Sequence, residues 1–181
     1  MKLAIEARDF ALQTHSLYDN FESVKTHLTS VTDKLDEICK DYFSFYDKDN
    51  NPVIAAGWLH DIVEDTNVTL QMIENDFGKP ISNLVNYVTD REGKNRKERH
   101  INTYYITRRS ELATLIKLCD RWHNHQRSID NNYSKLSMYF KEYDYFKFAL
   151  YDASVDLHKK LWADLDNQYK IMYSMKNNKG V

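Results

Sequence analysis

Apolar residues along this chain recur mostly at intervals of three and four positions, the spacing that places them on one face of an α-helix. Four Gly and two Pro residues are the only strong helix breakers among 181 residues. The pattern therefore predicts an all-α fold, with roughly eight to ten helices.

The first two predicted helices, residues 2–15 and 23–46, are defined by their apolar faces. A third, residues 52–64, starts with Pro52 after the turn-forming segment DKDNNP. The next predicted helix, residues 69–77, begins at the capping residue Thr69 and ends before Gly78. The remaining predicted helices span residues 81–90, 101–109, 110–127 and 135–151 and a last segment that ends near Tyr173.

The length fits one domain of ordinary size. We assign residues 1–173 to that single domain and expect residues 174–181, SMKNNKGV, to be a disordered tail. The longest apolar runs are too short to span a bilayer, and charged residues interrupt the N-terminal segment, so no signal peptide is expected and a cytoplasmic location is predicted. Cys39 and Cys119 show no CxxC spacing and are expected to be buried, reduced thiols.

The charge of the chain limits its partners. A net charge of −2 provides no overall electrostatic attraction for nucleic acid or an anionic membrane, so neither is predicted as a partner. Any anion site must be local, and the best candidate is the basic segment GKNRKERH, residues 93–100. Arg96, with Lys97 beside it, is the preferred member, although a solvated loop is an equally good interpretation of such a charge run.

Four ionisable side chains gather in the short apolar stretch AGWLHDIVEDTNV: His60, Asp61, Glu64 and Asp65. On a helix, His60 and Glu64 would share one face, and so would Asp61 and Asp65. The apolar neighbours predict that this helix is mostly buried, and buried carboxylates are costly unless they are paired or bind a metal. A divalent cation would supply the missing positive charge.

Two other predicted helices carry matching ligands. LCDRWHNH places Asp120 and Asn124 four residues apart, and His27 lies on the apolar stripe of residues 23–46. An isolated His-Asp pair usually belongs to a solvated helix face, but three converging helices can surround an ion. Imidazoles mixed with carboxylates suit manganese, iron or zinc rather than calcium, and such a site keeps positions open for catalysis.

Four further histidines receive no role in the predicted site. His123 and His125 flank Asn124 on opposite sides of a helix and cannot both face an ion, so neither is assigned as a ligand. His100 and His158 are expected at the surface.

These residues carry a resemblance to a known family. His27, the pair His60-Asp61, and Asp120 reproduce the H…HD…D signature of the HD-domain metal-dependent phosphohydrolases. WLHDIVEDTNVTLQMIENDFGKPISNLVNYVTD resembles the hydrolase domain of the Rel/Spo alarmone enzymes, and KLCDRWHN resembles their KLADRxHN. The similarity covers roughly residues 4–150, while NRKERH, MYFKEY and WADLD are similar to small stand-alone bacterial and phage HD proteins.

The resemblance implies an HD-domain helical fold and a role for each matching residue. It implies that one metal ion, usually manganese in this group, is bound by His27, His60, Asp61 and Asp120. The pair that would orient or activate the attacking water is Glu64 and Asp65. Contacts to the nucleoside or the phosphates are implied for Asn124, Arg96 and Tyr143.

The substrate implied is a small phosphorylated nucleotide, with release of pyrophosphate from the 3′ position of a (p)ppGpp-type alarmone. One segment departs from the family: SLYDNFES, residues 16–23, stands where the alarmone hydrolases carry basic residues that help to hold guanine, and Lys25 is the nearest cation. Two alternatives therefore stay open. One is a phosphatase or phosphodiesterase for another nucleotide, such as ppApp, a nucleoside monophosphate or a phosphorylated dinucleotide cofactor like NADPH; the other is a non-catalytic module that binds a nucleotide or a partner protein. No oligomeric state is predicted.

Overall fold

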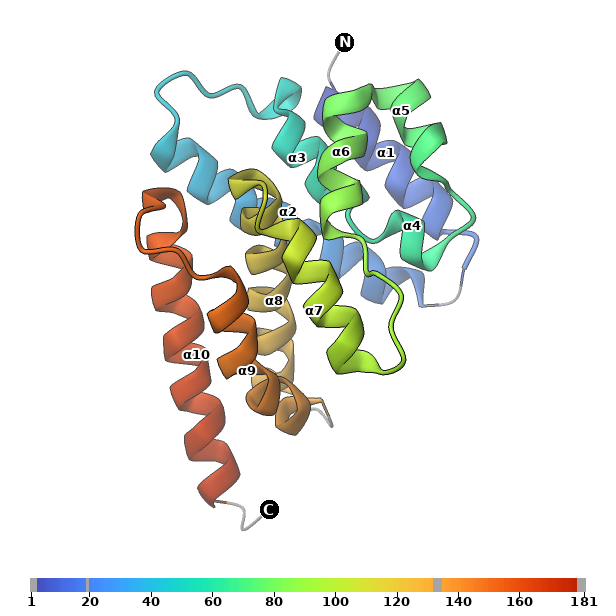
Figure 1. The fold of residues 1–181 in the computed structure, drawn as a ribbon. Coiled ribbons are helices and arrows are strands. Elements are labelled where there is room, and N and C mark those ends of the chain that lie inside the picture. The colour runs from blue at the N-terminus through green and yellow to red at the C-terminus, as the bar shows by residue number, and fades with distance from the viewer. Residues whose placement is uncertain (1–2, 19, 132–134, 179–181) are drawn as a thin grey trace.

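The structure is a computed structural model, and it describes residues 3–18, 20–131 and 135–178. Within these ranges the chain forms ten α-helices, two short 3-10 turns and no strand, which confirms the predicted all-α class (Figure 1). The helices are α1 (Leu3–His15), α2 (Phe21–Tyr42), α3 (Pro52–Leu59), α4 (Ile62–Asp65), α5 (Leu70–Phe77), α6 (Lys79–Val88), α7 (Arg96–Thr107), α8 (Glu111–Asp130), α9 (Leu136–Leu150) and α10 (Lys159–Asn178). The 3-10 turns are η1 (Lys48–Asn50) and η2 (Asp156–His158).

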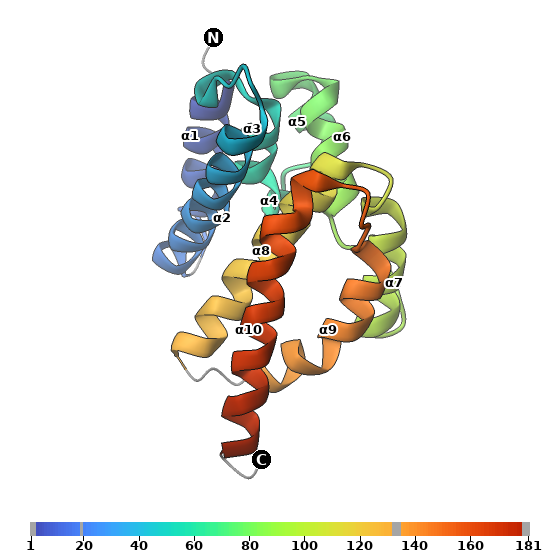
Figure 2. The same cartoon turned by 90° about the vertical axis from the view of Figure 1, so that its left-hand side faces the viewer.

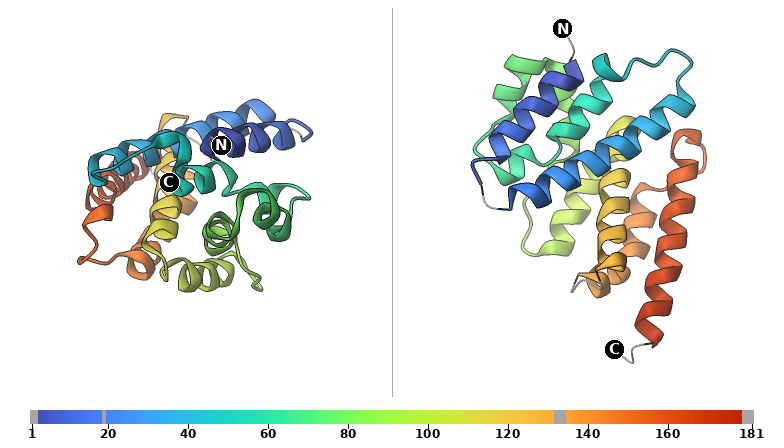
Figure 3. Two further views of the ribbon diagram at one scale, coloured as in Figure 1. Left: turned by 90° about the horizontal axis from the view of Figure 1, so that it is seen from above. Right: turned by 180° about the vertical axis from the view of Figure 1, so that it is seen from behind.

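Helices α3 and α8 occupy the centre of the fold. Helix α3 packs against α1, α2 and α6, while α8 packs against α2, α6, α9 and α10. Seen from the side, α1 to α3 lie on one flank of the molecule and α7 with α9 on the other (Figure 2). From behind, α2 crosses over both α3 and α8 (Figure 3). Segments distant in sequence therefore meet where α2, α3 and α8 come together.

Local sequence signals explain where several helices begin and end. The Asn51 side chain accepts a hydrogen bond from the backbone N–H of Val53, next to Pro52 in the first turn of α3. Thr69 caps α5 in the same way, and Gly78, at φ 85°, ends that helix in a conformation that favours glycine. These predicted boundaries are confirmed.

Other boundaries differ from the prediction. The helix expected over residues 52–64 is interrupted at His60 and Asp61, which separate α3 from α4. The basic segment 93–100 is half helical, because the side chain of Asn95 accepts from the backbone N–H of Glu98 and starts α7 at Arg96. Helix α10 continues to Asn178 rather than ending near Tyr173, and residues 179–181 of the expected tail lie outside the described residues.

One buried core joins most of the helices. Its largest fully buried side chains include Leu28, Leu35, Ile54, Tyr104 and Phe146. The two cysteines are buried and free, as expected. None of the described helices has the length and apolarity needed to cross a bilayer.

Gly57 permits the close approach of α2 and α3. A Cβ at this position would lie 2.5 Å from Leu35 Cδ1 and 3.2 Å from Thr32 Cγ2. Since Leu35 is fully buried, it has little room to move aside. We expect Gly57→Ala to lower the free energy of unfolding by about 1–3 kcal/mol, measured by urea denaturation. Unchanged or increased stability would show that α2 can shift at no cost.

Candidate active site

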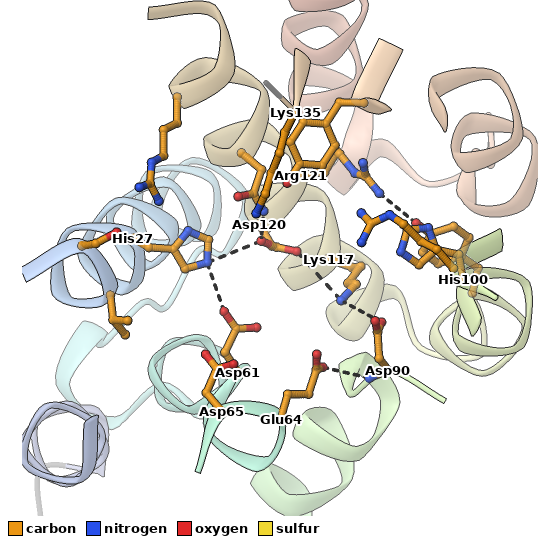
Figure 4. A pocket seen from close by; sticks show the side chains of 17 residues that line it. His27, Asp61, Glu64, Asp65, Asp90, His100, Lys117, Asp120, Arg121 and Lys135 are labelled. Carbon is orange, nitrogen blue, oxygen red and sulfur yellow. Dashed lines mark hydrogen bonds and ion pairs between the residues drawn. The ribbon is translucent and has the colours of Figure 1, made fainter. Parts of the chain in front are cut away.

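Four predicted metal ligands come together where α2, α3, α4 and α8 meet. His27 Nε2 lies 3.2 Å from His60 Nε2, 3.2 Å from Asp61 Oδ2 and 3.4 Å from Asp120 Oδ1. One possible ligand atom from each of His27, His60 and Asp61 lies within 4.8 Å of the other two. Figure 4 shows His27, Asp61 and Asp120 pointing toward one another from three separate elements. Among the described residues, His27, His60 and Asp61 thus form a compact group of possible ligands, and Asp120 lies beside it through its contact with His27.

Backbone angles near those of a helix continue through the turn between α3 and α4, since His60 has φ −60° and ψ −35° and Asp61 has φ −98° and ψ −6°. Both lie in the turn between the helices, and His60 Nε2 is 3.1 Å from Asp61 Oδ2. The predicted single helix is interrupted at these two residues, but the predicted spacing of Asp61 and Asp65 holds, because the Asp65 backbone N–H donates to the Asp61 carbonyl at 3.0 Å across one turn.

A backbone carbonyl fixes the orientation of the His60 ring. Its Nδ1–H donates to the Gly57 carbonyl oxygen at 2.8 Å, which leaves Nε2 facing the cluster. This is the usual arrangement of a metal-binding histidine, in which the nitrogen remote from the ion is held by a hydrogen-bond acceptor.

The electrostatics of the cluster favour a bound cation. Burial opposes ionisation of Asp61, yet the imidazoles of His60 and His27 hold the pKa of its carboxyl well below the ordinary range. Burial likewise opposes protonation of His60, yet Asp61 and Asp120 raise its pKa to about 9. Both shifts mean that the carboxylates draw positive charge to this point. A proton supplies it in the metal-free protein, and a divalent ion would supply more.

A cavity of about 320 Å³ opens in front of the cluster. Figure 4 shows its acidic end around Asp61 and Asp65 and its basic end around Arg121. The cations that line it are Arg96, Lys117, Arg121, Arg127 and Lys135. A multiply charged phosphate ester with a metal-bound end suits this division of charge.

Glu64 lines the cavity at its acidic end, near Asp61 and Asp65 (Figure 4). Its carboxylate accepts a hydrogen bond from the backbone N–H of Asp90 at 2.8 Å. Although the side chain reaches solvent, the protein around it desolvates the carboxyl and, with Asp61 nearby, raises its pKa to about 7 despite the opposing charge of Lys117. Desolvation and Asp61 also raise the pKa of Asp65. A carboxyl group whose pKa is raised toward the working pH is suited to general-base chemistry.

Comparisons with known proteins place the chain in a family. No family model matches it. Guanosine-3′,5′-bis(diphosphate) 3′-pyrophosphohydrolase MESH1 of Xenopus tropicalis is 32% identical over 123 residues, which cover 67% of this chain and 67% of that protein. The chain belongs to the MESH1 family of guanosine-3′,5′-bis(diphosphate) 3′-pyrophosphohydrolases. The predicted membership in the HD-domain alarmone hydrolases is thereby confirmed.

Two other similarities agree with the MESH1 assignment. The human MESH1 protein is 38% identical over 73 residues, covering 40% of this chain and 41% of its own. A solved structure of a metazoan ortholog of SpoT, which hydrolyzes ppGpp and plays a role in starvation responses, matches 94% of this chain and 95% of its own. Its TM-score is 0.69 at 24% identity, a level that establishes the shared fold.

In this MESH1-family chain a buried ion-pair network supports the basic end of the cavity. Glu142 accepts hydrogen bonds from Arg96 Nε at 2.6 Å and from Arg121 Nη1 at 3.1 Å. Arg121 also donates to the Tyr104 hydroxyl at 2.9 Å. Glu142 and Arg121 are both buried, so each compensates the charge of the other.

We expect Glu142→Gln to destabilise the fold, because it leaves the buried Arg121 guanidinium without its counter-charge. The expected loss in the free energy of unfolding is about 3 kcal/mol. Asp144→Asn, which neutralises an exposed carboxylate on the same helix, is the matched control and should change stability by less than about 0.5 kcal/mol. Equal stabilities of the two variants in chemical denaturation would contradict a structural role for Glu142.

The predicted substrate residues divide into two groups. Asn124 and Arg96 line the cavity, and Asn124 Nδ2 donates to Asp120 Oδ1 at 2.5 Å. Lys25, Lys97 and Tyr143 are not among the lining residues.

The three residues outside the cavity have other surroundings. Lys25 is exposed, 4.0 Å from Glu22, and Lys97 is exposed in the first turn of α7. The prediction that Tyr143 faces the cavity is wrong. Its buried ring stacks on Tyr169, and its hydroxyl donates to Asp166 at 2.7 Å.

Two histidines expected at the surface are buried. His100 lines the cavity, with Nδ1 2.9 Å from the Tyr145 hydroxyl. His158 donates through Nε2 to the Glu111 carbonyl at 2.8 Å. The prediction is wrong for His100 because α7 extends through the end of the basic segment and places His100 on its buried face with Thr103 and Tyr104.

Sequence reasoning also missed Lys117 and Asp90. Lys117 Nζ donates to the Val88 carbonyl at 3.1 Å and lies 3.8 Å from Asp90 and 3.9 Å from Asp120. A usable signal existed for the lysine, which precedes Asp120 by three residues and so lies one helical turn away on the same face. None existed for Asp90, which reaches the site from the loop after α6.

Proposed function

We propose that this chain is a metal-dependent phosphohydrolase that releases pyrophosphate from the 3′ position of a guanosine bis(diphosphate)-type alarmone. The observation that carries the proposal is the meeting of His27, His60, Asp61 and Asp120 beside Glu64 in a cavity with a basic far end. The curated MESH1 relatives are named for this activity, which supports the choice of reaction.

We propose that His27, His60, Asp61 and Asp120 hold one divalent ion, with manganese as the preferred metal. Mixed nitrogen and oxygen ligands suit such borderline ions, and four protein ligands leave positions open. When bound, the ion lowers the pKa of a water molecule and neutralises phosphate charge.

Glu64 and Asp65 are the proposed acceptors of the proton from the attacking water. The Asp90 backbone N–H holds one Glu64 oxygen, so the other remains available to the water. The raised pKa of each carboxyl makes it a better base than an ordinary surface carboxylate. Both side chains line the cavity on the same side as Asp61.

The cations at the far end are proposed to bind the phosphates. Arg96 and Arg121 are held in place by Glu142, so they need little reorganisation when an anion arrives. Lys117 lies nearer the ligand cluster, 3.9 Å from Asp120. Asn124, which also bonds Asp120, is the proposed neighbour of the nucleoside.

The test is a product analysis with a panel of nucleotides. We would incubate the purified protein with manganese and ppGpp, ppApp, a nucleoside monophosphate or NADPH, and identify the products by mass. Free pyrophosphate from ppGpp, absent without metal, is the expected result. Release of orthophosphate alone, or no turnover of ppGpp under conditions that convert another substrate, would contradict the proposal.

A second candidate is the same reaction on an adenine alarmone. The cavity end near α2 is lined by Ser23 and Val24, and none of the described residues from 16 to 25 places a cation there. Guanine selectivity then has less electrostatic support than in the alarmone hydrolases with a basic segment. A higher kcat/KM for ppApp than for ppGpp would favour this candidate.

A further inference from the structure

The two ring nitrogens of His27 face different surroundings. Nε2 lies within 3.4 Å of His60, Asp61 and Asp120, so it is the nitrogen that would meet a metal ion. Nδ1 points the other way and lies 2.7 Å from Nδ1 of His123, with the ring centroids 4.8 Å apart. Each nitrogen of His27 therefore has its own partner.

His123 lies behind His27 and outside the cavity. Its ring lines a separate groove between α2 and α8, together with Thr26 and Trp122, and it is not among the residues that line the cavity. Helix α8 thus reaches His27 twice: Asp120 meets Nε2 from the cavity side, and His123 meets Nδ1 from the groove side. His123 cannot be a further ligand of the same ion, because its near nitrogen faces Nδ1 and not Nε2.

The tautomers follow from this geometry. A metal binds the lone pair of an imidazole nitrogen, so Nε2 of His27 must be free of a proton and Nδ1 must carry one. The 2.7 Å contact then makes His27 Nδ1–H the donor and His123 Nδ1 the acceptor. The His60 ring has the same tautomer, and its Nδ1–H donates to the Gly57 carbonyl.

We propose that His123 is a positioning residue that accepts the Nδ1–H of His27 and thereby turns the Nε2 lone pair of that ring toward the metal. The inference rests on the proposed metal-dependent function. It assigns a role to a histidine that sequence reasoning left without one. Because this acceptor is a side chain and the acceptor for His60 is a backbone carbonyl, substitution can remove the one for His27.

A matched pair of substitutions separates the hydrogen bond from the packing. Asn places an oxygen near the position of the histidine Nδ1, whereas Leu has the same branched shape with a methyl group there. Leu is also the better helix former, so any loss of fold stability in α8 should fall on Asn and not on Leu. Gln126→Ala, which alters the same groove without contacting His27, is the control.

The measurement is the affinity of each purified variant for Mn²⁺, by isothermal titration calorimetry. We expect His123→Leu to weaken binding about 10–100-fold, while His123→Asn and Gln126→Ala stay within a few-fold of the unsubstituted protein.

Other outcomes have distinct meanings. Equal Mn²⁺ affinity in His123→Leu and the unsubstituted protein overturns the inference and leaves the proposed function standing. Equal losses in Leu and Asn also overturn it, since they would mean that ring volume matters and the acceptor does not. If the unsubstituted protein binds no divalent metal, the proposed function fails and the inference fails with it.

Discussion

Asp61→Ala is expected to yield a folded protein that no longer retains a metal ion and no longer hydrolyses its substrate. The Asp61 carboxylate contacts both imidazoles of the cluster, at 3.2 Å from His27 Nε2 and 3.1 Å from His60 Nε2. Its removal takes away a ligand and also the negative charge that makes the cluster attractive to a cation. Metal content by mass spectrometry and pyrophosphate release would both fall to background.

Asp76→Ala is the control for this experiment, since it removes an exposed aspartate of α5 on another part of the surface. It should keep both metal and turnover. Stoichiometric metal in the Asp61→Ala protein would contradict the proposed ligand set, and full activity without metal would contradict the proposed chemistry.

Glu64→Gln is expected to separate metal binding from turnover. Glu64 is not in the ligand cluster, and the amide oxygen of Gln can still accept the hydrogen bond from the Asp90 backbone. The variant should therefore bind the metal with nearly unchanged affinity and fold normally. It cannot take a proton from water, so kcat should fall by about 10²–10⁴ with a smaller effect on KM.

The pH profile provides an independent check on Glu64. Only the ionised carboxylate can accept a proton, so turnover should fall as the pH drops through the pKa of this group, which is about 7 in the metal-free protein. A bound cation lowers that pKa, so the acid limb should lie at or below pH 7. Glu64→Gln should lack this limb in its residual activity. An unchanged limb, or an unchanged kcat, would assign the base to another group.

The sequence was sufficient to predict the helical class and to bring forward His27, His60, Asp61 and Asp120 as candidate ligands, because both inferences use local patterns. Apolar spacing of three and four recovers the helices, and Thr69 and Gly78 mark their ends through capping and left-handed backbone geometry. The ligands were recognised as residue types that are costly to bury inside an apolar segment. That argument does not require knowledge of the tertiary structure.

Features that depend on packing between helices were not predictable in this way. The apolar pattern continues through His60 and Asp61, whereas the structure places a turn there between α3 and α4. Glu142 lies in an aromatic-rich segment whose pattern predicts a core helix and gives no sign of an ion pair. Its partner Arg121 lies 21 residues away in sequence. The contact between His27 and His123 spans 96 residues. Such pairings become visible only when the helices are placed in space.

The origin of the four proposed ligands in distant parts of the chain has a thermodynamic consequence. His27 comes from α2, His60 and Asp61 from the turn after α3, and Asp120 from α8, so an unfolded chain cannot present them together. A metal that binds the native state alone stabilises it by about 2.7 kcal/mol when its concentration is one hundred times Kd. The melting temperature should therefore rise with the logarithm of the metal concentration above Kd, and at a given concentration it should rise more for an ion that binds more tightly. Thermal shift across a series of divalent ions would rank them as occupants of the site before any substrate is known.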